Sequence, residues 1–311
     1  MLVRERTQDT GARWLSPEND GTDAVLHCRD HQPVRMSARF GHAAPAAAGN
    51  GGEVAFTVTG QRRHRLVGRE EATGFHAVVT PDADGSASAE WRLPADDWDG
   101  FDRWAFGTFR FRATLHDTHG RAVAAATSGK LRHYATTVGV FGFGPTAEGF
   151  SNAEVRRLAR DLGGVAVGPR DHWALRELAR QVRPGETGIR LFGYSLGGHS
   201  AVRLARWLAR RGVGVETLVG IDPVDLLQQR GLRVPANVGR AVSFYQRNGS
   251  RLVVLVGRMS RGLPFLGRDA ENVRVDARRN PDGSPVMHED MPYHMRAEVA
   301  EILRRPSVAL R

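Results

Sequence analysis

Residues 193–199, which read Gly-Tyr-Ser-Leu-Gly-Gly-His, constrain this chain more than any other segment. They follow the apolar run 189–192 and precede the helical pattern of residues 201–211. A Gly-x-Ser-x-Gly turn between a strand and a helix is typical of a nucleophile elbow, which lifts the serine hydroxyl clear of a sheet. The outer glycines lack Cβ atoms, so strand and helix can approach closely around the turn. The segment therefore predicts Ser195 as a nucleophile at a strand-to-helix junction.

After about residue 134, strand-like patterns alternate with helix-like patterns. Strands that alternate with helices imply crossover connections and a mostly parallel sheet. The second half of the chain is therefore predicted to be an α/β domain that spans residues 134–311. The predicted strands lie at 138–141, 189–192, 215–221, 242–245, 252–256 and 273–275, and the predicted helices at 151–162, 171–182, 201–211 and 292–303.

Residues 23–128 show a period of two instead. Apolar side chains alternate with polar ones at residues 54–58, 87–93 and 109–115, with turn signals between these runs. This pattern predicts strands with one buried face and one solvated face. Several short strands at this spacing predict an all-β sandwich over residues 1–133. The stretch 82–129 resembles bacterial immunoglobulin-like modules, which act as spacers, docking units or binders.

A serine hydroxyl needs a histidine to take its proton and an acid to orient that histidine. Asp222 ends the apolar run 217–221. This is the carboxyl end of a predicted strand, where parallel sheets place their functional residues. Asp225 is close enough to be an alternative acid, and no acidic residue lies between Asp225 and Asp269. We therefore predict Asp222 as the acid.

Two histidines late in the chain can supply the base. His288 lies in the loop between a predicted strand at 272–276 and the last helix, whereas His294 falls in the first turn of that helix. A helix dictates where its side chains point, so the loop position favours His288. An incidental surface histidine is the alternative interpretation. His199, four residues after Ser195 on the same predicted helix, is expected to be structural.

Acyl transfer also needs two backbone N–H donors for the developing oxyanion. The first is expected from Leu196, directly after the nucleophile. The second is expected from the glycine-rich turn after the first strand of the α/β domain, with Phe143 preferred and Gly142 or Gly144 as alternatives. An ordinary glycine-rich turn is the other interpretation of this segment.

The elbow at residues 193–199 and the Gly-Ile-Asp-Pro sequence at 220–223 resemble the lipase branch of the α/β hydrolases. Pancreatic-type lipases similarly carry a Gly-x-Ser-Leu-Gly-x-His elbow and a Gly-Leu-Asp-Pro acid turn. In that branch the acid follows an earlier strand than in most hydrolases, which agrees with the choice of Asp222. The resemblance covers two short motifs. It implies an α/β-hydrolase domain that cleaves carboxylic esters, with lipid or acyl esters as the leading substrates.

Such a Ser-Asp-His mechanism needs no metal and no organic cofactor. Two other interpretations of the function stay open. The first is a phospholipase effector, exported without a signal peptide, whose sandwich is an adaptor and whose partners include a secretion system or an immunity protein. The second is a non-catalytic binding protein on a hydrolase scaffold.

The apolar segment 262–267 has two interpretations. It is flanked by arginines and contains leucine, proline and phenylalanine between two glycines. These residues are expected either to form a mobile lid or acyl-pocket wall, or to pack as an ordinary loop. The flanking arginines are Arg258, Arg261 and Arg268.

The formal charge of the chain is +10, and Lys130 is its only lysine. Arginines that are spread through a chain are typical of a GC-rich genome and of solvated helix faces. The positive excess also suits binding to an anionic membrane surface. No nucleic-acid-binding motif accompanies the arginines, so nucleic acid is not expected as a partner.

Cys28 is the only cysteine, which excludes an internal disulfide and a cysteine-based metal site. Residues 1–20 are polar and charged, without the apolar core of a signal peptide. No apolar run approaches the roughly 20 residues that span a bilayer. We therefore expect synthesis in the cytoplasm, with export by a signal-independent route left open.

Overall fold

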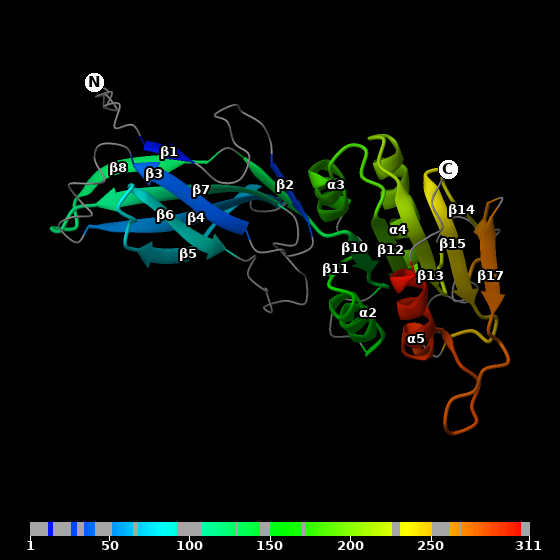
Figure 1. The fold of residues 1–311 in the computed structure, drawn as a ribbon. Helices are drawn as coiled ribbons and strands as arrows, with labels where there is room; N and C mark the ends of the chain where they lie inside the picture. The colour runs from blue at the N-terminus through cyan, green and yellow to red at the C-terminus, as the bar shows by residue number, and fades with distance from the viewer. Residues whose placement is uncertain are drawn as a thin grey trace. The chain divides into compact units, whose positions relative to one another are not determined.

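The structure of the chain is a computed structural model that divides into two compact units, with a boundary between His133 and Tyr134. Figure 1 labels the helices and strands of each unit. The predicted strand at 252–256, the helix start at residue 171, Gly144 and the three flanking arginines lie outside the described residues. The structure describes residues 12–14, 26–29, 34–40, 52–64, 68–91, 107–128, 130–143, 150–169, 172–225, 231–250, 262–267 and 269–305.

The first unit consists of strands in two sheets, and its described residues contain no helix. One sheet has the order β1-β3-β6, and the other has the order β2-β9-β7-β4-β5 with β8 also paired to β7. The strands are β1 (Ala12–Trp14), β2 (Leu26–Arg29), β3 (Val34–Phe40), β4 (Glu53–His64), β5 (Gly68–Val79), β6 (Ser86–Trp91), β7 (Gly107–His116), β8 (Ala122–Thr127) and β9 (Leu131–Tyr134).

The predicted alternation between core and solvent holds along β7, whereas on β4 the intervening Ala55 is buried as well. Along β7, Phe109 and Phe111 are buried, whereas Arg110 between them is exposed. The ring of Trp91 on β6 lies 5.0 Å from the Phe109 ring and 5.4 Å from the Phe111 ring, measured between centroids. The two sheets therefore share an aromatic core. The likeness to immunoglobulin modules stays a prediction.

The second unit is built on a six-stranded parallel sheet with the order β11-β10-β12-β13-β15-β17. The prediction of a mostly parallel sheet is confirmed. The short strand β11 and the two-stranded sheet of β14 and β16 were not predicted. The strands are β10 (Thr137–Val140), β11 (Val165–Val167), β12 (Ile189–Tyr194), β13 (Val215–Ile221), β14 (Leu232–Arg233), β15 (Val238–Tyr245), β16 (Phe265–Leu266) and β17 (Ala270–Arg274).

The strand order reverses at β10. The chain passes from β10 to β11 on one side and then returns to β12 on the other side. Open parallel sheets bind ligands beyond the carboxyl ends of the strands that flank such a reversal. The loops after β10 and β12 are therefore the expected borders of a functional site.

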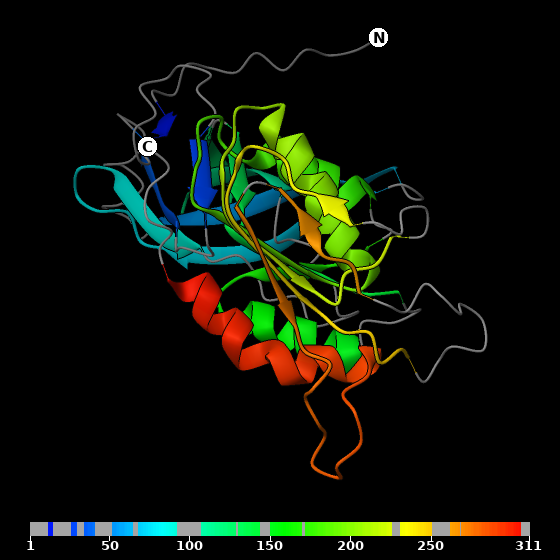
Figure 2. The ribbon, with the colours of Figure 1, turned by 90° about the vertical axis from the view of Figure 1, so that its right-hand side faces the viewer.

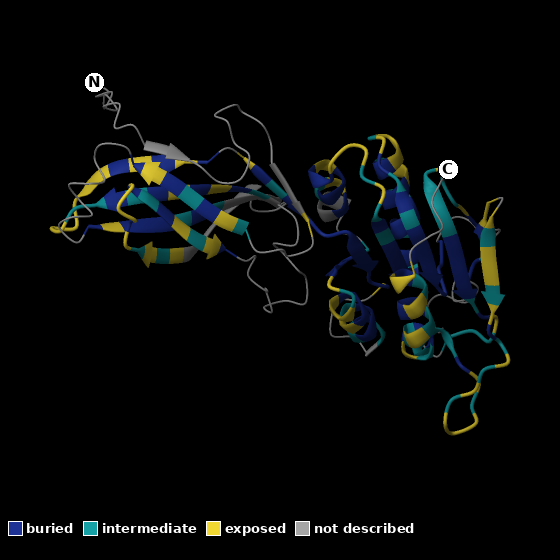
Figure 3. Ribbon diagram, in the orientation of Figure 1, coloured by how far each residue is buried: buried dark blue, intermediate teal, exposed yellow. Residues whose placement is uncertain are grey.

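Helices cover both faces of this sheet (Figures 1 and 2). Helices α2 (Phe150–Asp161) and α5 (Met291–Arg304) lie side by side on one face, and α3 (His172–Gln181) and α4 (Leu196–Ala209) lie on the other. The central strands are buried on both sides, and the exposed residues gather on the outer helix faces (Figure 3). Double coverage explains why these strands read as continuous apolar runs.

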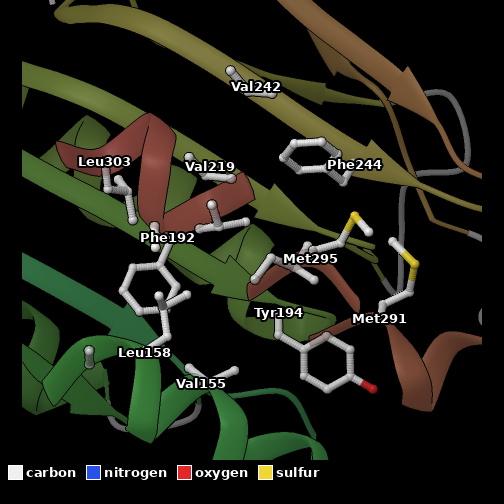
Figure 4. Packing of buried hydrophobic residues seen from close by; sticks show 14 of the residues in the cluster. Val155, Leu158, Phe192, Tyr194, Val219, Val242, Phe244, Met291, Met295 and Leu303 are labelled. Atoms are coloured by element: carbon white, nitrogen blue, oxygen red, sulfur yellow. The ribbon is translucent and has the colours of Figure 1, made fainter. Parts of the chain in front are cut away.

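A cluster of buried hydrophobic side chains lies beneath α2 and α5 (Figure 4). Leu158 on α2 and Met295 on α5 pack with Phe192 of β12 and Val219 of β13. The helical period of three to four residues places such side chains on one face of each helix. The core therefore fixes α5, and with it the segment before α5, against the central strands.

Candidate active site

Ser195 lies between β12 and α4, directly before the first helical turn. Its backbone has φ 55° and ψ −126°, a conformation that non-glycine residues rarely adopt. The Ser195 N–H donates to the carbonyl of Ile221 at 3.0 Å, and the Ser195 carbonyl accepts from the N–H of Val224 at 3.0 Å. Strand β13 and its following turn thus hold the serine in this strained geometry.

Close backbone contacts require the glycines around Ser195. A Cβ atom on Gly193 would lie 2.3 Å from the carbonyl oxygen of Gly197. A Cβ atom on Gly197 would lie 2.2 Å from the carbonyl oxygen of Val140 and 2.3 Å from that of Phe141. These distances are far inside van der Waals contact, so α4 can approach β10 and β12 this closely only without side chains here.

We expect Gly197→Ala to lower the free energy of unfolding by about 1–3 kcal/mol, because the added methyl group meets backbone that cannot move freely. Urea unfolding followed by circular dichroism measures this loss. Gly188→Ala is the matched control, since its Cβ atom would approach only the Glu186 carboxylate, at 3.5 Å. Equal unfolding free energies for the two variants would contradict the steric argument.

Asp222 directly follows β13 and is completely buried. Its φ of 45° makes it the second described non-glycine residue with a positive φ, beside Ser195. Its Oδ1 accepts from the backbone N–H of Gln246 at 2.9 Å, and its Oδ2 accepts from the Gln246 side-chain amide at 2.7 Å. A buried carboxylate is tolerated when such donors compensate its lost hydration.

His288 lies between Asp222 and Ser195. Its Nδ1 is 2.6 Å from Asp222 Oδ2, and its Nε2 is 2.9 Å from Ser195 Oγ. The imidazole is 12% exposed, so the row is shielded from bulk water. The structure thus brings together the serine, acid and histidine that the sequence singled out, from β12, β13 and the 3-10 turn His288–Asp290.

Tyr194 packs against the imidazole ring of His288. Its ring stacks on the His288 ring with centroids 4.9 Å apart and an interplanar angle of 30°. Its hydroxyl donates to the His288 carbonyl at 3.2 Å. Burial raises the pKa of the Tyr194 phenol well above its usual range, so this group remains a hydrogen-bond donor. The next carbonyl, of Glu289, accepts from the Ser151 hydroxyl at 2.8 Å.

The alternative base and the alternative acid have other partners. His294 Nε2 lies 2.7 Å from Asn280 Oδ1. Asp225 Oδ2 lies 3.2 Å from Nδ1 of His199. The His199–Asp225 pair joins the first turns of α4 to the segment after Asp222, which agrees with the structural role expected for His199.

Burial lowers the pKa of His199 below its ordinary value of 6.5, and this outweighs the opposing effect of Asp225. The unfolded chain therefore takes up a proton at His199 at a higher pH than the folded protein does. Below about pH 6.5 this uptake favours unfolding, so His199 makes stability fall as pH falls. We expect His199→Gln to flatten the dependence of the unfolding free energy on pH between about pH 7 and 5. Urea unfolding at several pH values measures the difference, and identical slopes would contradict it.

The loop after β10 lies directly against the elbow. A Cβ atom on Gly142 would lie 2.7 Å from the Tyr194 ring and 3.1 Å from Ser195 Cβ. The Gly142 N–H donates to Asn152 Oδ1 at 2.9 Å. Gly142 is therefore a poor oxyanion donor, which corrects one of the alternatives, because the first turn of α2 already uses its N–H group. Phe143 stays the predicted donor of this loop.

Leu196 is the first residue of α4. The first N–H groups of a helix have no carbonyl acceptor within the helix, and the helix dipole adds partial positive charge there. The Leu196 N–H group therefore lies where an anion beside Ser195 would be stabilised.

The apolar segment 262–267 packs against the turn after β13, and its residues Phe265–Leu266 form the strand β16. Leu263 and Phe265 are buried, and the Leu263 N–H donates to the carbonyl of Pro223 at 2.7 Å. A Cβ atom on Gly262 would lie 1.8 Å from Asp222 Oδ1, so the start of the segment lies directly against the acid. A role as an acyl-pocket wall stays a prediction.

Sequence reasoning missed three residues that hold this site. Gln246 hydrogen-bonds to the acid, Asn152 hydrogen-bonds to the loop after β10, and the Tyr194 ring stacks on the imidazole of His288. Gln246 directly follows β15, so the signal that identified Asp222, a polar residue at a strand end, could have found it. Nothing in the sequence separates the other two from ordinary polar and aromatic residues.

Within the described residues, no group of three or more histidine, cysteine or carboxylate side chains could hold a metal ion. No helix in the described part of the chain is long and apolar enough to cross a bilayer.

No protein-family model matches the chain, and no curated protein matches it. Similar solved structures include the Vlm2 thioesterase domain, at 18% identity and a TM-score of 0.32, over 54% of this chain and 92% of that chain. A protein of Xanthomonas campestris pv. campestris described as a hydrolase of the α/β superfamily has 16% identity and a TM-score of 0.33, over 54% and 97% of the two chains. An arylesterase has 11% identity and a TM-score of 0.29, over 63% and 78%.

Proposed function

We propose that the second unit is a serine hydrolase of the α/β-hydrolase type that cleaves carboxylic esters. The observation that carries this proposal is the row of hydrogen bonds from Ser195 Oγ through His288 to Asp222, at 2.9 and 2.6 Å. With a proton on Nδ1, His288 donates to Asp222, and its Nε2 is free to accept the serine proton. This is the arrangement that activates a serine hydroxyl near neutral pH.

In the proposed reaction, Ser195 Oγ forms a bond to the ester carbonyl carbon as its proton moves to His288 Nε2. Asp222 stabilises the imidazolium that results. His288 then gives the proton to the leaving alcohol as the ester C–O bond breaks. A water molecule, deprotonated by the same nitrogen, releases the carboxylic acid and restores the serine.

The N–H groups of Leu196 and Phe143 are the proposed oxyanion donors. They come from the first turn of α4 and from the loop after β10, on the two sides of the strand-order reversal. Preorganised N–H groups stabilise the charge on the carbonyl oxygen as it develops, and each contributes on the order of 10²- to 10³-fold in rate.

A lipid or other acyl ester is the proposed substrate class. Phe143 is 66% exposed and directly follows Gly142, whose backbone lies against Ser195. An exposed phenylalanine one residue from this contact can offer apolar surface to an acyl chain. The motifs shared with lipases point the same way.

A fluorophosphonate probe and a panel of esters test the proposal together. We expect covalent labelling at Ser195 and faster hydrolysis of p-nitrophenyl esters with longer acyl chains than of the acetate. A phospholipid panel in the same assay separates a phospholipase from an enzyme for simple acyl esters. A folded protein that is neither labelled nor active on any ester would favour the non-catalytic alternative.

A further inference from the structure

Gln246 makes two hydrogen bonds to Asp222, whereas His288 makes one. It directly follows β15 and is completely buried. Its side-chain amide donates to Asp222 Oδ2 at 2.7 Å and to the Gly249 carbonyl at 3.1 Å, and its Oε1 accepts from the Gly249 N–H at 2.9 Å. With the backbone N–H bond to Oδ1, one residue binds both oxygens of the acid.

The Gln246 amide is also linked to His288 through Gly249. The Gly249 carbonyl, which accepts from the Gln246 amide, also accepts from the His288 backbone N–H at 2.9 Å. The orientation of the amide is dictated by its neighbours. Its nitrogen faces two acceptors and its oxygen faces one donor, so the reversed orientation would place like groups against each other.

We propose that Gln246 is a positioning residue, which holds the Asp222 carboxylate so that Oδ2 receives the Nδ1–H of His288. This inference rests on the proposed hydrolase function. Oδ2 accepts from both Gln246 Nε2 and His288 Nδ1, so the two donors together fix the rotation of the carboxylate. Without the amide, one donor is lost and the turn that carries Gly249 loosens behind His288.

The first test is Gln246→Leu, which keeps the volume and removes both side-chain donors. We expect kcat to fall about 10- to 100-fold, the loss typical of a hydrogen bond to a charged group, with KM changed less than about 2-fold. Gln181→Leu is the control, because Gln181 is also buried and donates to Glu177 on α3 at 2.6 Å. An equal fall in kcat for both folded variants would overturn the proposal.

The second test is Gln246→Glu, which keeps the shape of the side chain and changes only the hydrogen-bonding group. Two adjacent carboxyl groups share one proton, and the introduced carboxyl group, while it holds that proton, can donate to Asp222 as the amide does. We therefore expect the ratio of variant to wild-type kcat/KM to be highest at about pH 6 and to fall towards about pH 9 as that proton is lost. A merely structural role predicts a ratio independent of pH, and that result would overturn the proposal.

Different results contradict the proposed function and the positioning role of Gln246. A wild-type protein without esterase activity or fluorophosphonate labelling contradicts the proposed function. An active wild type whose Gln246→Leu variant is folded and equally active contradicts only the positioning role. Thermal unfolding of each variant, measured beside its kinetics, identifies any variant that has not folded.

The two helical faces of the second unit differ in charge. On α2 and α5, arginines are mixed with acids in ion pairs, such as Arg296 with Asp161 and Arg157 with Glu154. On α3, α4 and the turns after them, the described side chains between 175 and 188 and between 196 and 212 include two acids, Glu177, which pairs with Arg180, and Glu186. The arginines of these stretches are Arg176, Arg180, Arg183, Arg203, Arg206, Arg210 and Arg211.

Two of these arginines are held on an aromatic ring. The guanidinium carbon of Arg176 lies 5.3 Å from the centre of a Trp207 ring, and that of Arg203 lies 5.5 Å from it. Such cation–π contacts keep guanidinium groups in place on a surface. The described side chains of α3 and α4 include no exposed large hydrophobic residue. The described side chains of this face therefore offer a partner mainly positive charge.

We infer that the face of α3 and α4 docks on an anionic phospholipid surface. The face presents arginines over two neighbouring helices, which matches the extended phosphate layer of a membrane. Clusters of about 4–8 basic residues suffice for such binding, and each arginine near the surface contributes about 5-fold in affinity. Binding of this kind weakens as salt screens the charges.

Cosedimentation with vesicles tests this inference. We expect binding to mixed phosphatidylglycerol and phosphatidylcholine vesicles, little binding to pure phosphatidylcholine, and release by salt. Replacing Arg176, Arg183, Arg203 and Arg210 with glutamine should weaken binding at least about tenfold and leave hydrolysis of a soluble ester unchanged.

The matched control removes the same charge elsewhere, with glutamine at Arg110, Arg112, Arg121 and Arg132 of the first unit. Equal losses in the two variants would show that net charge alone drives binding and would overturn the assigned face. Binding to double-stranded DNA without binding to the anionic vesicles would overturn the lipid assignment. Ser195→Ala should bind as wild type does, so this test is independent of the proposed reaction.

Discussion

Ser195→Ala is expected to abolish covalent labelling by a fluorophosphonate and to lower kcat on p-nitrophenyl esters by on the order of 10⁶-fold. The hydroxyl is the only group removed, and among the described residues its one hydrogen bond is the bond that Oγ donates to His288 Nε2, at 2.9 Å. The hydrogen bonds of Ser195 to Ile221 and Val224 use only backbone atoms, so alanine can make them and keep the positive φ. The protein should therefore stay folded while the reaction is lost.

Active-site titration with the probe, followed by mass spectrometry of the labelled peptide, measures this result directly. Thermal unfolding of wild type and variant checks that both proteins are folded in the assay. Labelling that persists in Ser195→Ala, or that maps to another serine, would remove the basis of the proposed mechanism.

Asp222→Asn is expected to lower kcat by on the order of 10⁴-fold, the loss seen when the acid of a serine-protease triad becomes an amide. An amide nitrogen in place of Oδ2 would face two donors, the Gln246 amide and His288 Nδ1–H. The alternative rotamer instead places that nitrogen against the Gln246 backbone N–H. The first rotamer removes the acceptor that holds the proton on Nδ1. In both rotamers the negative charge that stabilises the imidazolium is gone, so His288 is a weaker base.

The rate of fluorophosphonate labelling separates this variant from Ser195→Ala. The nucleophile remains in Asp222→Asn, so labelling should be slowed and not abolished. Asp225→Asn is the control, because Asp225 faces His199 and not His288. If Asp225→Asn lost more activity than Asp222→Asn, the assignment of the acid would be wrong.

Local patterns predicted the elements that carry the site. The apolar run before the elbow became β12, and the run that ends at Ile221 became β13 with the bounds expected from the sequence. The last helix was placed to within a residue at each end. These elements were predictable because a strand buried on both faces and a helix with one apolar face leave periodic signals in consecutive residues.

Contacts between segments far apart in the chain left no such signal. Gly142 was an acceptable oxyanion donor by sequence, and only the approach of Asn152 shows that its N–H is used. Gln246 follows a predicted strand, but only the pairing of β15 with β13 shows that its amide binds Asp222. The short strand β11 was missed because three residues are too few to establish a period.

The sequence by itself determined that a serine sits on a strained turn between a strand and a helix, and that an aspartate ends the following strand. Both follow from local backbone needs, glycines for close approach and a polar residue at a strand end. Only the tertiary structure decided which histidine faces the serine. His288 and His294 are six positions apart, and packing of α5 on the sheet turns the first towards Ser195 and the second towards Asn280. That choice depends on side chains from three separate strands and a helix, which no window of consecutive residues contains.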